Sequence, residues 1–181
     1  VASRPLWITG NAQSITRNPF DSAVRRLSLA HQCNDRAELM SFIESAKRTI
    51  RLESQAIAQL AEQLNHDFSS ACELCLHCEG RIVVTGMGKS GHIASKIAAT
   101  LASTGTPAFF MHPAEASHGD LGMLTLKDVV LALSNSGTSA EIVLLLPLMQ
   151  RLGTSLISLT SDANSTLARA SDAHLLVSVA E

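Results

Sequence analysis

From Arg81 onward, five short apolar runs alternate with longer segments that have the composition of helices. The segments at 89–104, 139–151 and 163–170 are each long enough to be a crossover between strands. This alternation is typical of a parallel sheet with helices on both faces. We therefore predict an α/β fold, a three-layer sandwich around a five-stranded parallel sheet. The expected strands are Ile82–Thr85, Ala108–Met111, Val129–Leu133, Ser155–Leu159 and His174–Val177.

A long amphipathic helix is predicted ahead of the sheet, beginning near Asp35. Apolar residues recur there at spacings of three, four and seven, which is the pattern of one helix face. Glu53 interrupts this apolar seam, either as an edge position or as a buried or interfacial carboxylate. The seam is longer than one small sheet needs to cover, so we expect it to pack against neighbouring subunits. Its members are Leu39, Ile43, Ala46, Ile50, Ile57, Leu60 and Leu64.

Residues 1–34 contain Pro5, Gly10 and Pro19 and have no sustained periodicity, so they are predicted to be an irregular arm. The expected domain is then 35–181. Four arginines interrupt every apolar stretch of the arm, which is unlike a signal peptide, and we expect a cytoplasmic protein. These are Arg4, Arg17, Arg25 and Arg26.

Charge and composition exclude two classes of partner. The formal net charge is −2 and aromatic residues make up 3% of the chain, so neither a basic surface nor stacking platforms for nucleic acid are expected. No apolar run reaches the ~18 residues that a membrane-spanning helix needs. We therefore expect neither a nucleic-acid partner nor a membrane partner.

Three cysteines are spaced as Cys72-x-x-Cys75-x-x-Cys78, with His77 beside the last. This spacing can hold a metal or an iron–sulfur cluster. It also places the three side chains roughly in line on one face of a helix. A closed metal site would need His77 or a distant fourth ligand, so we favour the helix face, within a short helix at 67–78.

The first loop that could bind a ligand is Gly86-Met87-Gly88-Lys89-Ser90-Gly91, between a strand and a helix. Gly-x-Gly-x-x-Gly in this position is found in dinucleotide-binding folds. The second strand, however, is followed by His112 and not by the acidic residue that holds a ribose hydroxyl. Lys89 and Ser90 are better suited to a phosphate monoester.

The second loop, Ser134-Asn135-Ser136-Gly137-Thr138-Ser139, follows the strand Val129–Leu133 and opens a helix. An ordinary helix N-cap requires one hydroxyl, and this loop carries four. Free N–H groups and the helix dipole favour an anion at such a position. We therefore predict that Ser134, Ser136, Thr138 and Ser139 bind a phosphate group.

Together the two loops resemble the sugar isomerase (SIS) domain, and the segment His112–Gly122 resembles the arabinose-5-phosphate isomerases of that family. The resemblance covers about residues 36–181. It implies a flavodoxin-like SIS fold and the interconversion of D-arabinose 5-phosphate and D-ribulose 5-phosphate, for lipopolysaccharide or capsule synthesis. It also implies a homo-oligomer, with a tetramer as the expected form. In this family the domain ends beyond the residue matching Glu181 and is followed by two CBS modules, so both are expected to be missing from the printed sequence.

The resemblance also implies roles for individual residues. Lys89 and Glu141 match positions regarded as catalytically relevant, and the family has a further glutamate that is expected just beyond Glu181. The positions that match phosphate contacts are Ser90, Ser134, Ser136 and Ser139, and those near the sugar are Gly105, Thr106, His112 and His118. His92 and His174 are expected to be structural.

Isomerisation by proton transfer needs no cofactor, and none is expected. His112, Glu115 and His118 could supply imidazole and carboxylate ligands suited to zinc. We predict that His112 binds a zinc ion that occupies the sugar site and inhibits the reaction. A different function is a non-catalytic domain that senses sugar phosphates, since SIS domains also serve transcription regulators.

Overall fold

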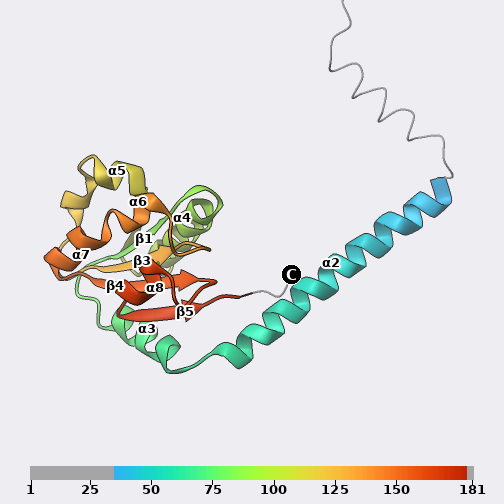
Figure 1. The fold of residues 1–181 in the computed structure, drawn as a ribbon, viewed down its shortest axis with the longest axis horizontal. Coiled ribbons are helices and arrows are strands. Elements are labelled where there is room, and N and C mark those ends of the chain that lie inside the picture. Colours follow the sequence, from blue (N-terminus) through green and yellow to red (C-terminus); the bar gives the residue numbers. More distant parts are fainter. Residues whose placement is uncertain (1–34, 179–181) are drawn as a thin grey trace, which may run out of the picture. The chain divides into compact units, whose positions relative to one another are not determined.

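The computed structural model describes residues 35–178, with side-chain surroundings from residue 41 onward. The predicted irregular arm at 1–34 lies outside the described residues. The chain divides into two units, 1–53 and 54–181, and the first helix crosses this boundary. In chain order the elements (Figure 1) are α2 (Asp35–Gln63), α3 (His66–Leu76), β1 (Ile82–Gly86), α4 (Gly88–Ser103), β2 (Ala108–Met111), α5 (Pro113–Ser117), the 3-10 helix η2 (Asp120–Met123), β3 (Val129–Leu133), α6 (Ala140–Val143), α7 (Leu146–Leu152), β4 (Ser155–Thr160), α8 (Thr166–Ala170) and β5 (Ala173–Leu176).

The five strands form one parallel sheet in the order β2-β1-β3-β4-β5. Every strand lies within one residue of its predicted position. The central strands are buried on both faces, so they are apolar almost throughout, as parallel strands generally are. The predicted parallel sheet is confirmed.

Two apolar clusters, one on each face of the sheet, make the three layers. On one face, Ala71 of α3 and Ala94 and Ala98 of α4 pack on alternate residues of the strands, among them Ile82 and Ile157. The opposite face carries α5 to α8, which contribute apolar residues such as Ala116, Ile142, Met149 and Leu167. The predicted three-layer sandwich is therefore confirmed.

The segment predicted as a single helix at 139–151 consists of two short helices. The first, α6, ends at Val143, and α7 begins at Leu146 with Pro147 in its first turn. Proline lacks a backbone N–H and is favoured in the first turn of a helix, so Pro147 starts a new helix instead of continuing the old one. Pro113 begins α5 in the same way, directly after β2.

Cys72 and Cys75 lie on α3, whereas Cys78 follows the end of that helix, so the predicted helix face is formed only in part. Cys75 and Cys78 pack against the core cluster of α3 and α4, whereas Cys72 is exposed. Burial, together with the neighbouring Cys72 and Cys78, raises the pKa of the Cys75 thiol. In residues 41–178 no three His, Cys, Asp or Glu side chains are arranged to hold a metal ion, so the described chain forms no clip at these cysteines. Nor does any described helix have the length and apolar character of a membrane span.

Asp128 fixes the amino-terminal edge of the sheet from a fully buried position just before β3. Its carboxylate accepts hydrogen bonds from the backbone N–H of Arg81 at 2.7 Å and of Thr125 at 2.8 Å, and from the Thr125 hydroxyl at 3.0 Å. The Arg81 guanidinium lies 3.5 Å away. Burial alone would raise the pKa of Asp128, but the hydrogen bonds from Thr125 and Arg81 outweigh it and hold the pKa below the ordinary 3.8.

Replacing Asp128 by asparagine is expected to lower the free energy of unfolding at pH 7 by about 2 kcal/mol, because an NH2 group would then face N–H donors. The folded-state pKa is depressed, so this stabilisation is complete above the unfolded pKa of ~3.9 and is lost as pH falls through the folded value. The difference in the free energy of unfolding between the two proteins should therefore shrink as pH falls from about 5 toward 3. Urea unfolding across this range measures it, with the exposed Asp120→Asn as the control. An equal difference in the free energy of unfolding at both ends of this pH range would contradict the lowered pKa of Asp128.

Candidate functional site

The strand order creates a crevice at the carboxyl ends of β1 and β3. The connection from β1 leads to β2 on one side, whereas the connection from β3 leads to β4 on the other side. Ligands of open α/β sheets bind at such a switch point, which in the order 2-1-3-4-5 lies between strands 1 and 3. Both loops singled out from the sequence, 86–91 and 134–139, lie at this switch point.

The turn from β1 into α4 depends on two glycines that let the strand and helix approach closely. A Cβ on Gly91 would lie 2.7 Å from the Gly86 carbonyl oxygen. A Cβ on Gly86 would lie 3.0 Å from the Ser90 carbonyl and 3.1 Å from that of Leu133 in β3. The N-cap residue Met87 offers no side-chain hydrogen bond to the helix. The first N–H groups of α4 therefore remain available to an anion.

The serine-rich loop is curled by its own hydroxyl groups. The buried Ser134 Oγ lies 2.9 Å from Ser139 Oγ and accepts a hydrogen bond from Gly137 N at 3.1 Å. Ser136 Oγ accepts from Thr138 N at 3.3 Å and from Thr138 Oγ1 at 3.1 Å. The structure thus brings together all four hydroxyls that the sequence predicted, over the carboxyl end of β3.

A third loop, between β4 and α8, braces the serine-rich loop. Ser161 donates to the Asn135 carbonyl from its N–H and from its hydroxyl, both at 2.8 Å. Leu167 N donates to the Gly137 carbonyl at 3.0 Å. This loop was not predicted from the sequence, although its polar run Ser161-Asp162-Ala163-Asn164-Ser165 directly follows a strand, as the serine-rich loop does.

A small cavity of about 240 Å³ opens where these loops meet. Two predicted residues line it, Ser90 from α4 and Ser134 from the loop after β3. Its volume is below the ~300 Å³ at which ligand pockets usually begin. The remaining lining residues are Ile93, Leu133, Asn135, Leu159, Thr160 and Val177.

The two residues predicted to be catalytic are exposed, one on each side of the switch point. Lys89 lies in the first turn of α4 and Glu141 in the first turn of α6. His112 directly follows β2 at the carboxyl ends of the strands, and its Nδ1 accepts a hydrogen bond from Ala114 N at 3.2 Å as the N-cap of α5. His118 is exposed at the other end of α5.

Gly105 and Thr106 lie at the other end of the strands, the amino-terminal end. They precede β2, and they line a cavity of about 580 Å³ with Arg81 and Ala108 at the amino-terminal ends of β1 and β2. Within one chain they are therefore separated from the serine-rich loop by the length of a strand. The structure of one chain therefore does not place them beside the predicted phosphate loop.

The predicted zinc ligands do not form a site in the described chain. His112, Glu115 and His118 are not brought together, because among residues 41–178 no three His, Cys, Asp or Glu side chains could hold a metal ion. His112 uses Nδ1 as a helix cap, which leaves only Nε2 for coordination. The residues present do not fit a zinc ion on their own, and no step below is assigned to one.

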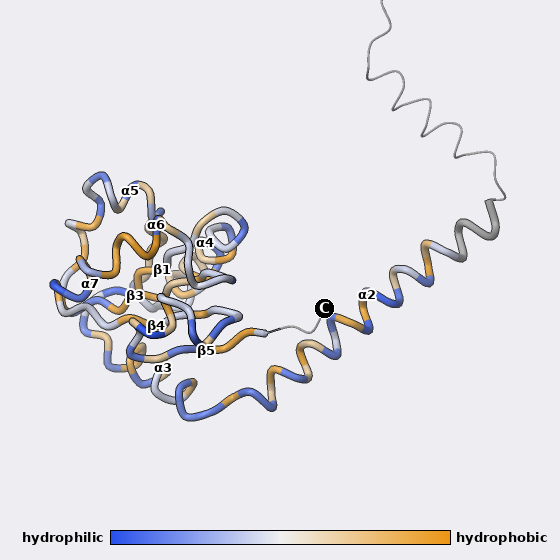
Figure 2. The backbone as a smooth tube through the Cα atoms, viewed as in Figure 1, coloured by the Kyte–Doolittle hydropathy of each residue, from blue (hydrophilic) through white to orange (hydrophobic). Residues whose placement is uncertain are grey.

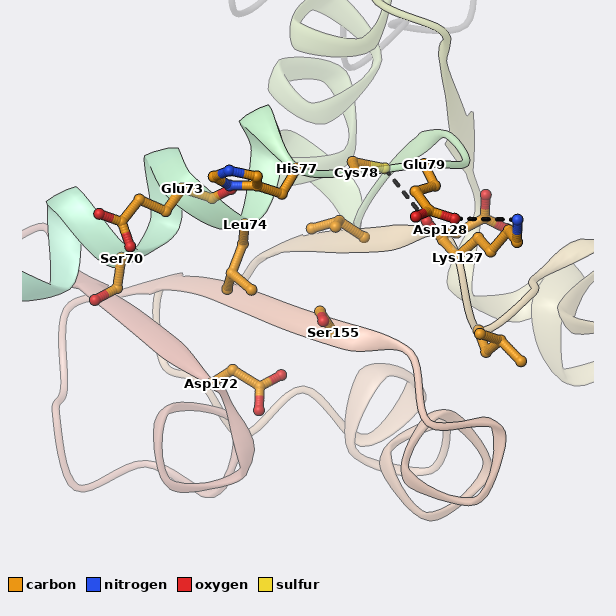
Figure 3. A pocket seen from close by; sticks show the side chains of 12 residues that line it. Ser70, Glu73, Leu74, His77, Cys78, Glu79, Lys127, Asp128, Ser155 and Asp172 are labelled. Atoms are coloured by element: carbon orange, nitrogen blue, oxygen red, sulfur yellow. Dashed lines mark hydrogen bonds and ion pairs between the residues drawn. The ribbon is translucent and has the colours of Figure 1, made fainter.

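A larger cavity, of about 590 Å³, lies at the amino-terminal edge between α3 and the starts of β3, β4 and β5 (Figure 3). Three of its four acidic side chains are engaged in the fold. Asp172 accepts a hydrogen bond from Leu156 N at 2.8 Å, and Glu79 pairs with Lys127 at 3.1 Å. Asp128 accepts the hydrogen bonds from Arg81 and Thr125. These carboxylates at the amino-terminal ends of the strands stabilise the sheet, whereas the carboxyl ends carry the hydroxyl-rich loop and the first N–H groups of α4.

Comparison with known proteins decides the family. A sequence profile of the SIS domain matches residues 75–181. The chain belongs to the SIS domain family. It is 61% identical over 142 residues to the arabinose 5-phosphate isomerase KdsD of Pseudomonas aeruginosa, a match that covers 78% of this chain and 44% of that protein. Against the KdsD of Escherichia coli strain K12 the identity is 52% over 140 residues, covering 77% and 43%.

A solved structure agrees with this assignment. That of E. coli CFT073 c3406 in complex with A5P superposes with a TM-score of 0.74 at 41% identity, covering 78% of this chain and 75% of that chain. The relatives place the domain with the arabinose 5-phosphate isomerases of the family, as its loops predicted. The chain spans less than half the length of the curated relatives it matches.

Gly137 offers a direct test of the serine-rich loop. Its φ is +63°, and an added Cβ would overlap the Ser165 side chain. Gly153 has a similar φ of +71° but open space around it. We expect Gly153→Ala to cost about 1 kcal/mol of stability and to leave ligand binding unchanged, because only backbone strain is added.

Gly137→Ala carries the same backbone strain and also displaces the loop. We expect it to weaken the binding of arabinose 5-phosphate by about tenfold or more, since misplaced donors lose several hydrogen bonds. Calorimetric titration of both variants, with thermal unfolding alongside, compares the two effects. Equal affinity in the two variants would show that the loop does not bind the phosphate.

Proposed function

We propose that this domain interconverts D-arabinose 5-phosphate and D-ribulose 5-phosphate through an enediol intermediate. The observation that carries the proposal is the curled serine-rich loop at the switch point of the sheet, with the N–H groups of α4 facing the same crevice. The relatives named KdsD, at 61% and 52% identity, support the choice of sugar. They are more than twice as long as the matched region, so the activity of the complete protein is part of the proposal.

In this scheme the phosphate group anchors one end of the sugar. The hydroxyls of Ser90, Ser134, Ser136 and Ser139 and the free N–H groups of α4 donate to its oxygens. Such hydrogen bonds to an ionised phosphate are short and about twice as strong as neutral ones. They fix the position of the sugar chain, so that C1 and C2 reach groups several ångströms from the loop.

The reaction moves one proton between C2 and C1, and a single general base can remove and return it. Glu141 is the acidic residue nearest in sequence to the serine-rich loop, and we propose that it is required, either as this base or as a group that orients the substrate. Lys89 would stabilise the negative charge on the enediolate oxygen. Glu141 is exposed in a single chain. A carboxylate base works best when it is partly desolvated, so we infer that the sugar or a neighbouring subunit covers it.

Deuterium wash-in at C2 of arabinose 5-phosphate in heavy water tests this role in the full-length protein. We expect Glu141→Gln to lower the exchange rate by about 10²-fold or more, as removal of a general base usually does. The control is Glu79→Gln, which removes an exposed carboxylate at the opposite edge of the sheet. Full exchange in the Glu141 variant would remove this residue from the mechanism.

The same measurement separates the enzyme from a non-catalytic sensor. A sensing domain would bind sugar phosphate through the same loop but would not exchange the C2 proton. Binding without wash-in by the unsubstituted protein would therefore favour the sensor.

We also propose that the protein is a homo-oligomer, a tetramer, held in part by α2. Ile43, Ile50 and Ile57 follow one another at intervals of seven residues along this helix, and all three are exposed. Figure 2 shows hydrophobic positions recurring along α2 between hydrophilic ones. Isoleucine at every seventh position is the pattern of helices that pack side by side. A second copy of the chain would bury this seam.

Ile50→Asp in the middle of the seam should weaken the oligomer, because a charge would be buried without a partner. Leu52 is also exposed and apolar but lies on another face of α2, so Leu52→Asp is the matched control. Sedimentation at micromolar concentration should show smaller particles for Ile50→Asp alone. If both variants sediment like the unsubstituted protein, α2 does not hold the assembly.

A further inference from the structure

Thr160, the last residue of β4, lies buried between β5 and the two loops of the switch point. Its hydroxyl takes part in three hydrogen bonds. It donates to the Asp162 carbonyl at 2.8 Å, accepts from Asp162 N at 3.1 Å, and lies 2.9 Å from Nε2 of His174 in β5.

The direction of the third hydrogen bond follows from counting protons. A threonine hydroxyl has one proton and two lone pairs, and a carbonyl oxygen can only accept. The Thr160 proton is therefore used on the Asp162 carbonyl, and Asp162 N fills one lone pair. His174 must then donate from Nε2–H into the second lone pair, which requires a proton on Nε2 of the imidazole.

This hydrogen bond fixes the side chain that supports the serine-rich loop. With the hydroxyl turned toward Asp162 and His174, the Thr160 methyl group faces Gly137, 3.1 Å from where a Cβ of that glycine would be. Thr160 also lines the 240 Å³ cavity together with Ser90 and Ser134. The hydrogen bonds of Thr160 to Asp162 form a turn that includes Ser161. Ser161 in turn donates twice to the Asn135 carbonyl of the serine-rich loop.

We propose that His174 is a positioning residue for phosphate binding, which acts by donating Nε2–H to Thr160 and so holds the serine-rich loop in its curled form. The proposal rests on the proposed function only in that the ligand of the loop is a sugar phosphate. His174 lies on β5, and the contact that links it to the loop is the one with Thr160. Its effect should therefore appear in binding and not in the chemical step.

His174→Leu removes the donor and frees Thr160 to rotate. We expect the KM for arabinose 5-phosphate and the dissociation constant for inorganic phosphate to rise about five- to tenfold, the equivalent of one net hydrogen bond, with kcat nearly unchanged. His174→Gln should restore most of the affinity, because its amide nitrogen is as many bonds from Cβ as Nε2 of histidine. A variant that only damages the fold would not be rescued in this way.

A double-mutant cycle tests whether His174 acts through Thr160. Thr160→Val keeps the shape and removes the hydroxyl, so adding His174→Leu to it should cost almost no further phosphate affinity. Additive losses would show that His174 acts by another route, and unchanged phosphate affinity in His174→Leu would overturn the proposal.

The protonation of His174 can be checked without any variant. In ¹⁵N-labelled full-length protein, long-range ¹H–¹⁵N spectra should show a proton on Nε2 of His174, and a neutral ring protonated on Nδ1 alone would overturn the proposal. The phosphate titration and this spectrum do not require turnover. Failure of isomerase activity with a normal Nε2–H signal and a His174-dependent phosphate affinity would therefore refute the proposed function and leave this inference standing.

Discussion

The close approach of β1, α4 and β3 at their shared edge is the constraint on which the site depends. Side chains at Gly86 and Gly91 would be crowded, because a Cβ there would lie 2.7 to 3.1 Å from backbone carbonyl oxygens of Gly86, Ser90 and Leu133. This contact draws the first turn of α4 against the sheet beside the serine-rich loop. Larger residues at the two glycines would push the helix away, and its N–H groups would no longer face the hydroxyls of Ser134 and its neighbours.

The polar groups at the amino-terminal ends of the strands differ in role from those at the carboxyl ends. At the amino-terminal edge, the carboxylates of Asp128 and Asp172 accept backbone N–H groups, so their charge is used to connect strands and loops. At the carboxyl edge, hydroxyls bond mainly to one another and to loop amides, which leaves donors that can turn toward an anion. A cavity by itself is therefore poor evidence for the site. The cavity in Figure 3 is larger than the one at the loops, yet it lies at the amino-terminal ends of the strands, where the carboxylates stabilise the fold.

The candidate site of one chain is open to solvent. Lys89 and Glu141 are exposed, the cavity at the loops is small, and Gly105 and Thr106 lie at the far edge. Each of these features is explained if a second copy of the chain closes the crevice. The proposed homo-oligomer and the proposed isomerase are in this way connected, because a general base needs a drier environment than a single chain provides.

The sequence by itself determined the layers, the strands and the two loops of the site, because alternating apolar runs and glycine spacing are local patterns with local causes. The start of a second helix at Pro147 was also visible in the sequence, although we predicted one continuous helix there. Only the tertiary structure could show that Gly105 and Thr106 lie at the other edge, or that Gly137 must be glycine because Ser165 lies against it. The pairing of His174 with Thr160 is of the same kind. These relations join residues that are far apart in the chain, and no local pattern encodes which of them will meet once the strands have paired.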